Sequence, residues 1–323
     1  MYALAPAPRL QGRHLLRISD FSRDEVSAVL RLAAYLKGRR LGEQLPLLRG
    51  KTLAMLFEKP SLRTRVSFEV AMAQLGGQVI FAQGNEFMIG SRETPEDAAR
   101  VLSRYVDAIV IRTHAHEPLR RFADAATVPV INGLSEVAHP CQALADLLTI
   151  QEHFGVLAGL HIAYVGDARN NVALSLAEAA MLAGATVHFG APGTHRPSEE
   201  MLAQLQLMGK PNGGTARAFA NPVRAVRGVD VVYTDVWTSM GEEALAERNQ
   251  ALLAPFQVNE KLFAYAAPHA IFMHCLPAHR GEEVSAGLID GARSAVFQQA
   301  ENRMHVQKAL LVALLTDLKG IPV

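Results

Sequence analysis

Six short polar elements of the sequence carry residue types that can bind an anion, donate to a carbonyl oxygen or hold an ammonium group. They are SLRT at 61–64, Arg112, HPCQ at 139–142, GDARNN at 166–171, DVWTSMG at 235–241 and HCLP at 274–277. Each follows an apolar run of strand length. In open α/β sheets, ligands gather where strands end at their carboxyl edge. The spacing therefore predicts that these elements share one ligand site.

Two arginines have the chemistry of a phosphate site. Arg63 lies where an apolar strand gives way to a helix, and a helix N-terminus offers unpaired N–H groups to an anion. Arg63 and Arg112 can hold a phosphate between two guanidinium groups, with Ser61 and Thr64 donating beside them. The alternative is that Ser61 only caps the helix and that both arginines are solvated.

Three further side chains can handle an amide or an amine. His139 and Gln142 lie at a helix start, where both can donate to a carbonyl oxygen, although a histidine there is commonly only a cap. Asp235 offers a carboxylate to an ammonium group, or is simply the one acid of a turn. Cys275 is a thiol at a strand end, for which inert burial is the default interpretation.

The sequence lacks the familiar cofactor and metal motifs. It contains no G-x-G-x-x-G or Walker-type loop, and GDARNN lacks dinucleotide-binding spacing. His114 and His116 form one histidine pair, while His274, Cys275 and His279 form another group, but neither has zinc-site spacing. We therefore expect no nicotinamide or ATP cofactor and no metal.

Composition argues against several classes of partner. The 323 residues include 32 Lys and Arg against 31 Asp and Glu, so a net charge of +1 provides no general field for nucleic acid or anionic membrane. No apolar run approaches the roughly 18 residues of a membrane span, and residues 1–16 contain no signal-like apolar segment. The only cysteines are Cys141 and Cys275, which gives no disulfide framework. We expect a cytoplasmic protein.

Strand-like and helix-like segments alternate twice along the chain, which indicates two α/β domains with parallel sheets, joined by interdomain helices. Strands are expected at 51–57, 78–82, 107–112, 128–132, 161–167, 186–190, 230–236 and 270–277. Helices are expected after residue 61 and at 94–105, 118–126, 139–155, 170–184, 198–208 and 300–318, with the apolar segment 294–299 before the last. Because the polar elements come from both halves, they predict one interdomain cleft.

The motifs FEKPSLRTRVSFE, HPCQALADL, GDARNN, DVWTSMGE, HCLPAHRGEE and AENRMH, in this order, resemble the ornithine carbamoyltransferase family across essentially the whole chain. Leu62 replaces the threonine that is commoner in that family. The resemblance implies a carbamoyl phosphate-binding domain at 1–152, an ornithine-binding domain at 153–298, and a helix at 299–323 that packs back on the first domain.

The resemblance also implies roles for individual residues. The carbamoyl phosphate site would comprise Ser61, Leu62 through its backbone, Arg63, Thr64, Arg112, His139, Pro140, Cys141, Gln142, Cys275, Leu276 and Arg303. The ornithine site would comprise Asn171, Asp235, Ser239 and Met240, with Cys275 and Leu276 near the δ-nitrogen. The catalytic set would be Arg63, His139, Gln142, Asp235 and Cys275.

The implied reaction joins carbamoyl phosphate and ornithine into citrulline and phosphate, without cofactor or metal. Asp235 or Cys275 would position the amine that must lose a proton. Synthesis and breakdown of citrulline would use the same site. The alternatives are a sibling transferase acting on putrescine or N-acetylornithine, and an inactive subunit that binds carbamoyl phosphate.

The family resemblance further implies a homotrimer, or a multiple of trimers, in which a loop at 83–92 reaches a neighbouring site. A glutamine would be expected before Ile89-Gly90, but Met88 stands there and a thioether cannot donate a hydrogen bond. Met88 would then only pack, unless Gln83 or Ser91 takes the polar role.

Overall fold

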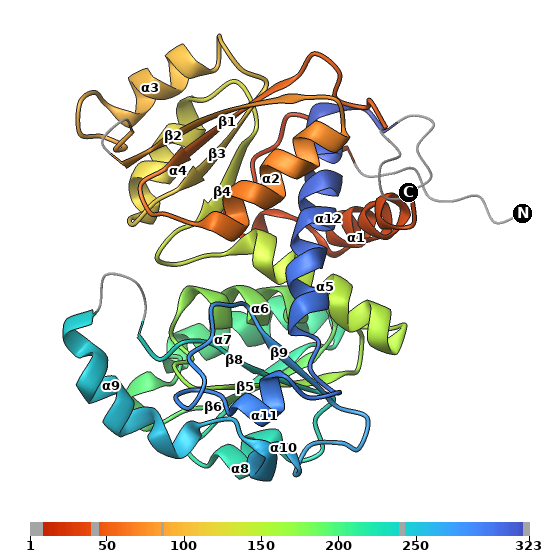
Figure 1. The fold of residues 1–323 in the computed structure, drawn as a ribbon, viewed down its shortest axis with the longest axis vertical. Helices are drawn as coiled ribbons and strands as arrows, with labels where there is room; N and C mark the ends of the chain where they lie inside the picture. The colour runs from red at the N-terminus through yellow and green to blue at the C-terminus, as the bar shows by residue number, and fades with distance from the viewer. Residues whose placement is uncertain (1–8, 40–44, 85–86, 239–242, 319–323) are drawn as a thin grey trace, which may run out of the picture. The chain divides into compact units, whose positions relative to one another are not determined.

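The computed structural model describes residues 9–39, 45–84, 87–238 and 243–318, and the chain divides into two compact units (Figure 1). Unit one contains Met1–Leu148 and Asn302–Val323, and unit two contains Thr149–Glu301. The domain limits expected at 152 and 298 lie inside helices α5 (Pro140–Phe154) and α12 (Val296–Leu315), which both units share. Each unit on its own is a parallel sheet flanked by helices, which confirms the predicted fold class.

Unit one has a four-stranded sheet in the order β2-β1-β3-β4. Its strands are β1 (Thr52–Phe57), β2 (Gln78–Gln83), β3 (Ala108–Arg112) and β4 (Val130–Leu134). Its helices are α1 (Arg23–Lys37), α2 (Leu62–Gln74), α3 (Pro95–Leu102), α4 (His116–Ala125) and parts of α5 and α12. A short 3-10 turn at Ile18–Asp20 precedes α1. Phe57 of β1 is paired with Arg112 of β3. The two strands therefore end side by side, and the polar segments that follow them start from neighbouring positions.

Unit two has a five-stranded sheet in the order β7-β6-β5-β8-β9. Its strands are β5 (His161–Val165), β6 (Thr186–Gly190), β7 (Thr215–Phe219), β8 (Val231–Thr234) and β9 (Ile271–His274). Its helices are α6 (Asn171–Ala183), α7 (Glu199–Gly209), α8 (Pro222–Val226), α9 (Ala246–Leu253), α10 (Glu260–Phe263) and α11 (Ala286–Ile289), with short 3-10 turns at Gly193–His195, Lys210–Asn212, Glu243–Leu245 and Ala254–Phe256.

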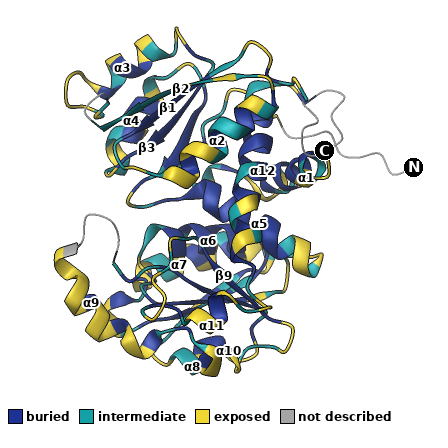
Figure 2. Ribbon diagram, viewed as in Figure 1, coloured by how far each residue is buried: buried dark blue, intermediate teal, exposed yellow. Residues whose placement is uncertain are grey.

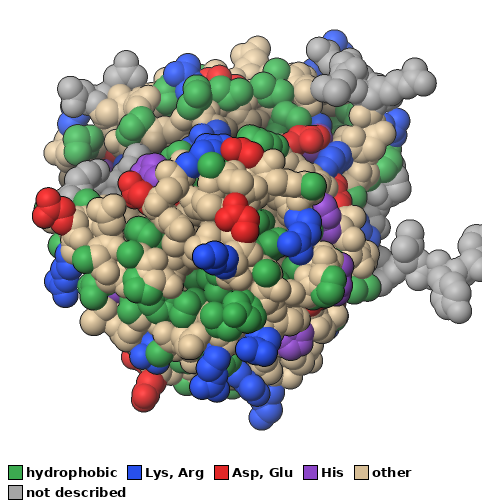
Figure 3. Space-filling model, turned by 60° about the horizontal axis from the view of Figure 1, so that its bottom comes forward, with side chains coloured by type: hydrophobic (Ala, Val, Ile, Leu, Met, Phe, Trp, Pro, Cys, Tyr) green, Lys and Arg blue, Asp and Glu red, His purple; other side chains and the backbone are tan. Residues whose placement is uncertain are grey.

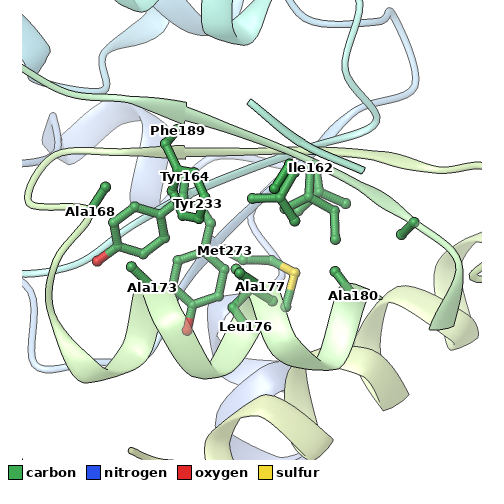
Figure 4. Close-up of a cluster of buried hydrophobic side chains, with 14 of the residues drawn as sticks. Ile162, Tyr164, Ala168, Ala173, Leu176, Ala177, Ala180, Phe189, Tyr233 and Met273 are labelled. Carbon is green, nitrogen blue, oxygen red and sulfur yellow. The ribbon is translucent and has the colours of Figure 1, made fainter. Parts of the chain in front are cut away.

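Apolar packing covers both faces of the unit-two sheet. On one face, Tyr164 of β5 and Tyr233 of β8 stack with ring centroids 5.6 Å apart and pack beside Ala173, Leu176 and Ala177 of α6 (Figure 4). The other face carries a second cluster that draws on α8, α10 and α11. Burial on both faces explains why these strands read as continuous apolar runs. By contrast, α9 is largely exposed (Figure 2).

Helices α8 to α11 had no counterpart in the predicted pattern, and three further features of the fold were missed or misread. Helix α1 begins at a Ser22 to Glu25 capping box, a local signal that the strand-and-helix alternation did not use. Strand β7 was missed because only Ala216 of its five residues is buried, so it lacks a strong apolar pattern. Residues 296–299 belong to α12, and before them only Ser294 forms an isolated bridge, with Phe272.

Two properties that were considered in the sequence, surface charge and membrane-spanning length, can be compared with the structure. Side chains of both charge signs are interspersed on the face that Figure 3 presents. Within the part of the chain that the structure describes, no helix combines the length and the apolar character needed to cross a bilayer.

Candidate active site

The turn between β1 and α2 is built around a helix cap. Ser61 Oγ accepts a hydrogen bond from Thr64 N at 3.3 Å and donates to Thr64 Oγ1 at 3.0 Å. Arg303 of α12 donates from Nη2 to the same Thr64 hydroxyl at 2.7 Å. Ser61 is thus a cap, and the turn also receives a buried guanidinium from the far end of the sequence.

Two arginines of unit one differ in environment. Arg63, in the first turn of α2, is exposed and makes no hydrogen bond or ion pair within the described residues. Arg112, the last residue of β3, is only 5% exposed. Leu62 is 77% exposed, so any part it plays in anion binding falls to its backbone.

His139 lies directly before α5 and is 4% exposed. Burial, followed by the positive charges of Arg303 and Arg112, holds the pKa of His139 well below its usual 6.5. The imidazole is therefore neutral at pH 7. Both arginines act electrostatically on His139, so the end of β3, the residue before α5 and helix α12 contribute to one polar site in unit one.

Gln142 differs from the sequence-based expectation. Its Nε2 donates to Asp146 Oδ1 at 2.9 Å, one helical turn along α5, while its Oε1 has no partner in the described part of the chain. One of the two N–H groups of Nε2 is therefore engaged within α5. In this conformation Gln142 also offers Oε1 as an acceptor, which suits an NH2 group.

Cys141 and Pro140 contribute shape more than chemistry. The Cys141 thiol is 1% exposed and donates to Asn132 O at 3.8 Å, and burial raises its pKa to about 12. It is therefore protonated at neutral pH and is not a nucleophile. Pro140 is the first residue of α5, a position where its missing N–H costs no helical hydrogen bond.

In unit two, Asp235 and Cys275 form a hydrogen-bonded pair at the ends of adjacent strands. The Cys275 thiol donates to Asp235 Oδ1 at 3.0 Å, and Asp235 is 8% exposed. Burial raises the pKa of Asp235, against the lowering effects of His274 and of the bond from Cys275. Cys275 is thus half-buried and engaged in a polar interaction, which differs from the full burial that the default interpretation assumes.

A buried pair behind Cys275, His274 and Glu283, was missed by the sequence reasoning. His274 Nδ1 accepts from Leu276 N at 2.9 Å, so its Nε2 carries the proton toward Glu283 Oε1 at 3.2 Å. Glu283 Oε1 also accepts from His279 N at 2.6 Å, and both His274 and Glu283 are 0% exposed. These bonds fix the backbone on both sides of Cys275. The pair joins a strand end to a later loop, and no local sequence pattern predicts such a contact.

Helix α6 presents two asparagines at its start. Asn170 caps the helix, with Oδ1 accepting from Ala173 N at 2.8 Å and Nδ2 donating to the Tyr164 hydroxyl at 2.8 Å. Asn171 is the first helical residue and is half-buried. Ser239 and Met240, which were expected to contact the same ligand, lie outside the described residues.

Gly166 allows the loop before α6 to pass close to the end of β8. Its φ of +127° is a conformation that side chains rarely adopt, and a Cβ there would lie 3.4 Å from Thr234 Oγ1. The Thr234 hydroxyl donates to Val165 O at 2.7 Å, so the loop that leads to Asn171 starts beside the strand end that leads to Asp235.

Among the described residues, two groups in unit two have ligand atoms within 4.8 Å of one another, as a metal site requires: Asp235, His274 and Cys275, and His279, Glu282 and Glu283. In the first group, both His274 nitrogens are engaged, with Leu276 N and Glu283. A metal there would have to break one of these bonds. The residues therefore fit a hydrogen-bonded site better than a metal site.

Both parts of the chain are similar to domains of known proteins. Residues 13–152 match the family described as aspartate/ornithine carbamoyltransferase, carbamoyl-P binding domain, and residues 158–314 match the corresponding Asp/Orn binding domain. Ornithine carbamoyltransferase of Anoxybacillus flavithermus is 51% identical over 308 residues, covering 95% of this chain and 98% of the relative.

Two further similarities come from Pyrococcus furiosus. Its protein named ornithine carbamoyltransferase, anabolic, is 48% identical over 311 residues, covering 96% of this chain and 98% of the relative. A solved structure of ornithine carbamoyltransferase from the same organism has a TM-score of 0.92 at 48% identity, covering 98% of this chain and 100% of that one.

Proposed function

This chain belongs to the aspartate/ornithine carbamoyltransferase family, and on that premise we propose that it transfers the carbamoyl group of carbamoyl phosphate to the δ-amine of L-ornithine, giving L-citrulline and phosphate. The relatives named above all carry the ornithine name, and one is named anabolic, which favours a role in arginine biosynthesis. The two free cysteines favour a cytoplasmic location.

The observation that carries the choice of acceptor is the buried carboxylate of Asp235 at the end of β8. A carboxylate attracts the ammonium group of an amino acid and repels a second carboxylate. An acceptor with a cationic side chain is therefore favoured over aspartate, the other acceptor in this family. Asn171 would add an amide for the α-carboxylate or α-amine.

The unit-one residues suit carbamoyl phosphate. Its phosphate would accept from Arg63, Arg112 and the N–H groups of the first turn of α2. Neutral His139 would donate to the carbamoyl oxygen, and Gln142 Oε1 would accept from the carbamoyl NH2. These contacts would fix the orientation of the carbamoyl group, because its oxygen would face the donor on His139 and its NH2 group would face the acceptor on Gln142.

The chemical step needs positioning and charge stabilisation more than a nucleophilic protein group, because phosphate is already a good leaving group. The ornithine δ-ammonium loses one proton to water, and its nitrogen forms a bond to the carbamoyl carbon as the bond from that carbon to the phosphate oxygen breaks. The nitrogen's second proton leaves with phosphate. Negative charge on the departing phosphate would be stabilised by Arg63 and Arg112.

Ornithine should be preferred to putrescine by a hundredfold or more in kcat/KM. Putrescine lacks the α-carboxylate, so the enzyme would lose the contacts made to that group, and a lost hydrogen bond to a charged group typically costs about 1.5–3 kcal/mol. The measurement is formation of ureido product from carbamoyl phosphate with ornithine, putrescine and N-acetylornithine in parallel.

Bovine serum albumin in place of the enzyme corrects for the uncatalysed reaction of carbamoyl phosphate with each amine. Equal rates with putrescine and ornithine would refute the ornithine assignment. An absence of ureido product with all three amines would support the inactive carbamoyl phosphate-binding subunit instead.

A homotrimer, or a multiple of trimers, is supported by apolar side chains exposed on unit one. Leu62 and Val66 on α2 are 77% and 45% exposed, Ile80 on the edge strand β2 is 56% exposed, and Met88 is 53% exposed. Exposed apolar side chains gathered on neighbouring elements are typical of protein interfaces. Ser91 Oγ donates to Met88 O at 2.9 Å, so its hydroxyl is engaged locally. Met88 would then contribute packing to the interface.

Ile80→Asp should weaken this assembly, because it places a charge among desolvated apolar groups. The matched control is Leu207→Asp on α7, which changes a side chain 73% exposed in unit two. Light scattering should give a mass near a multiple of three chains of 35.0 kDa for the wild type and the control, and a lower mass for Ile80→Asp. A monomeric wild type would contradict the proposal.

A further inference from the structure

Glu58 is a carboxylate placed beside a candidate anion site, a location where its charge would oppose phosphate binding. It is the first residue after β1 and lies three positions before Ser61, the cap of α2. Its side chain is half-buried. Retaining a negative charge there costs phosphate affinity, so the side chain needs a structural reason for its presence.

Both carboxylate oxygens of Glu58 accept hydrogen bonds from segments distant in the sequence. Oε1 accepts from Ile89 N at 2.8 Å. Oε2 accepts from the Thr113 hydroxyl and from His114 N at 3.1 Å. The backbone N–H of Glu58 donates to Arg112 O at 2.8 Å, which continues the β1–β3 pairing by one residue.

These bonds join three segments of unit one. The first is the β1–α2 turn that carries Ser61 and Arg63. The second is the end of β3, with Arg112 followed by Thr113 and His114, and the third is the loop that contains Ile89. Because Arg63 and Arg112 belong to the first two segments, Glu58 fixes the distance and orientation between two cations that would share one phosphate.

All three partners of the Glu58 side chain are donors, which explains the residue type. An ionised carboxylate is an acceptor on both oxygens. A glutamine of the same shape would replace one of these oxygens with an NH2 group. That NH2 group would face the N–H of Ile89 in one orientation and the N–H of His114 in the other, so a donor would face a donor in both. An aspartate, one methylene shorter, would not span the three partners from the same backbone position.

We infer that Glu58 is a positioning residue for carbamoyl phosphate, which holds Arg112 and the Ile89 loop in place relative to the phosphate-binding turn. This inference rests on the proposed function. The side chain acts through its neighbours: its oxygens are occupied by protein donors. A displacement of about 1 Å in a binding group can cost on the order of a hundredfold in rate.

The test compares Glu58→Gln with Glu69→Gln, a matched control on α2 whose carboxylate makes an exposed ion pair with Arg65 at 2.9 Å. Glu58→Gln should raise the KM for carbamoyl phosphate tenfold or more and leave the KM for ornithine within twofold, while the control changes neither by more than twofold. A merely structural role would lower the melting temperature and leave the ratio of the two KM values unchanged.

Thr113→Val provides a milder second variant, because it removes only the hydroxyl donor to Oε2 at a residue that is 0% exposed. It should raise the KM for carbamoyl phosphate two- to fivefold without affecting ornithine. If Glu58→Gln does not fold, this variant decides the matter. Unchanged carbamoyl phosphate KM values, or equal changes for both substrates, would overturn the inference.

Binding of inorganic phosphate separates this inference from the proposed function. Isothermal titration calorimetry with phosphate needs no turnover, and it should show weaker binding to Glu58→Gln than to the wild type or Glu69→Gln. If the wild-type protein makes no citrulline, the proposed function is refuted. The calorimetric comparison of phosphate affinity would still test the positioning role of Glu58. Equal phosphate affinity in all three proteins would contradict its positioning role.

Discussion

Arg63→Ala should lower kcat for citrulline formation by about a hundredfold or more while leaving the folded structure intact. The guanidinium would stabilise negative charge that grows on the departing phosphate, and removal of one such donor typically costs on the order of 10² to 10³ in kcat. Arg63 is exposed and makes no hydrogen bond or ion pair within the described residues, so its truncation breaks no intramolecular contact. The melting temperature should therefore stay within about 2 °C of the wild-type value, as for most surface substitutions.

Arg65→Ala is the control for this prediction. Arg65 lies on the same helix, is also exposed, and pairs with Glu69 at 2.9 Å. Its removal should change kcat less than twofold, because an exposed ion pair of this kind is worth well under about 1 kcal/mol. Retention of near-normal turnover by Arg63→Ala at saturating carbamoyl phosphate would rule out the proposed role.

Asp235→Asn should lower kcat/KM for ornithine by at least about a hundredfold, equivalent to about 2.7 kcal/mol. The amide keeps the shape of the side chain but removes the negative charge that would hold the substrate ammonium, and it also weakens the acceptor for the Cys275 thiol. The KM for carbamoyl phosphate should stay within threefold, because the side chains proposed to hold its phosphate and its carbamoyl group, Arg63, Arg112, His139 and Gln142, belong to unit one.

The stability of Asp235→Asn should move in the opposite direction from its activity. The folded-state pKa of Asp235 is raised by burial, so the folded protein holds this proton more tightly than the unfolded chain does. Ionisation above that pKa therefore costs folding free energy, and the cost is relieved as pH falls through the folded-state pKa. At pH 7 the asparagine variant should melt at the wild-type temperature or above it. A variant that is both inactive and strongly destabilised would point to a structural role for Asp235.

The sequence predicted the residue types of the candidate site better than their contacts. Arg63, Asp235 and Cys275 were selected because each lies near the end of an apolar strand run. The structure places Asp235 and Cys275 directly after β8 and β9, and Arg63 in the first turn of α2, the helix that follows β1. The hydrogen bond from Gln142 to Asp146, one turn further along the same helix, was not foreseen. It depends on which side of the helix both side chains face.

Glu58, His274 and Glu283 show what a one-dimensional pattern omits. Glu58 binds the backbone of residues more than thirty positions away, and the His274–Glu283 pair forms only when the loop after β9 folds back on its strand. Strand β7 was missed for a related reason, because an edge strand needs less apolar sequence than a central one. Contacts created by folding cannot be read from spacing alone.

The central claim is carbamoyl transfer from carbamoyl phosphate to ornithine, and ¹³C-labelled carbamoyl phosphate tests it most directly. The purified protein is incubated with labelled carbamoyl phosphate and ornithine, and the carbon is followed by NMR while phosphate is measured in the same sample. We predict a ureido carbon signal from citrulline that grows together with an equal amount of phosphate, at a rate far above the protein-free sample. Appearance of the label only in the breakdown products of carbamoyl phosphate, at the protein-free rate, would contradict the claim.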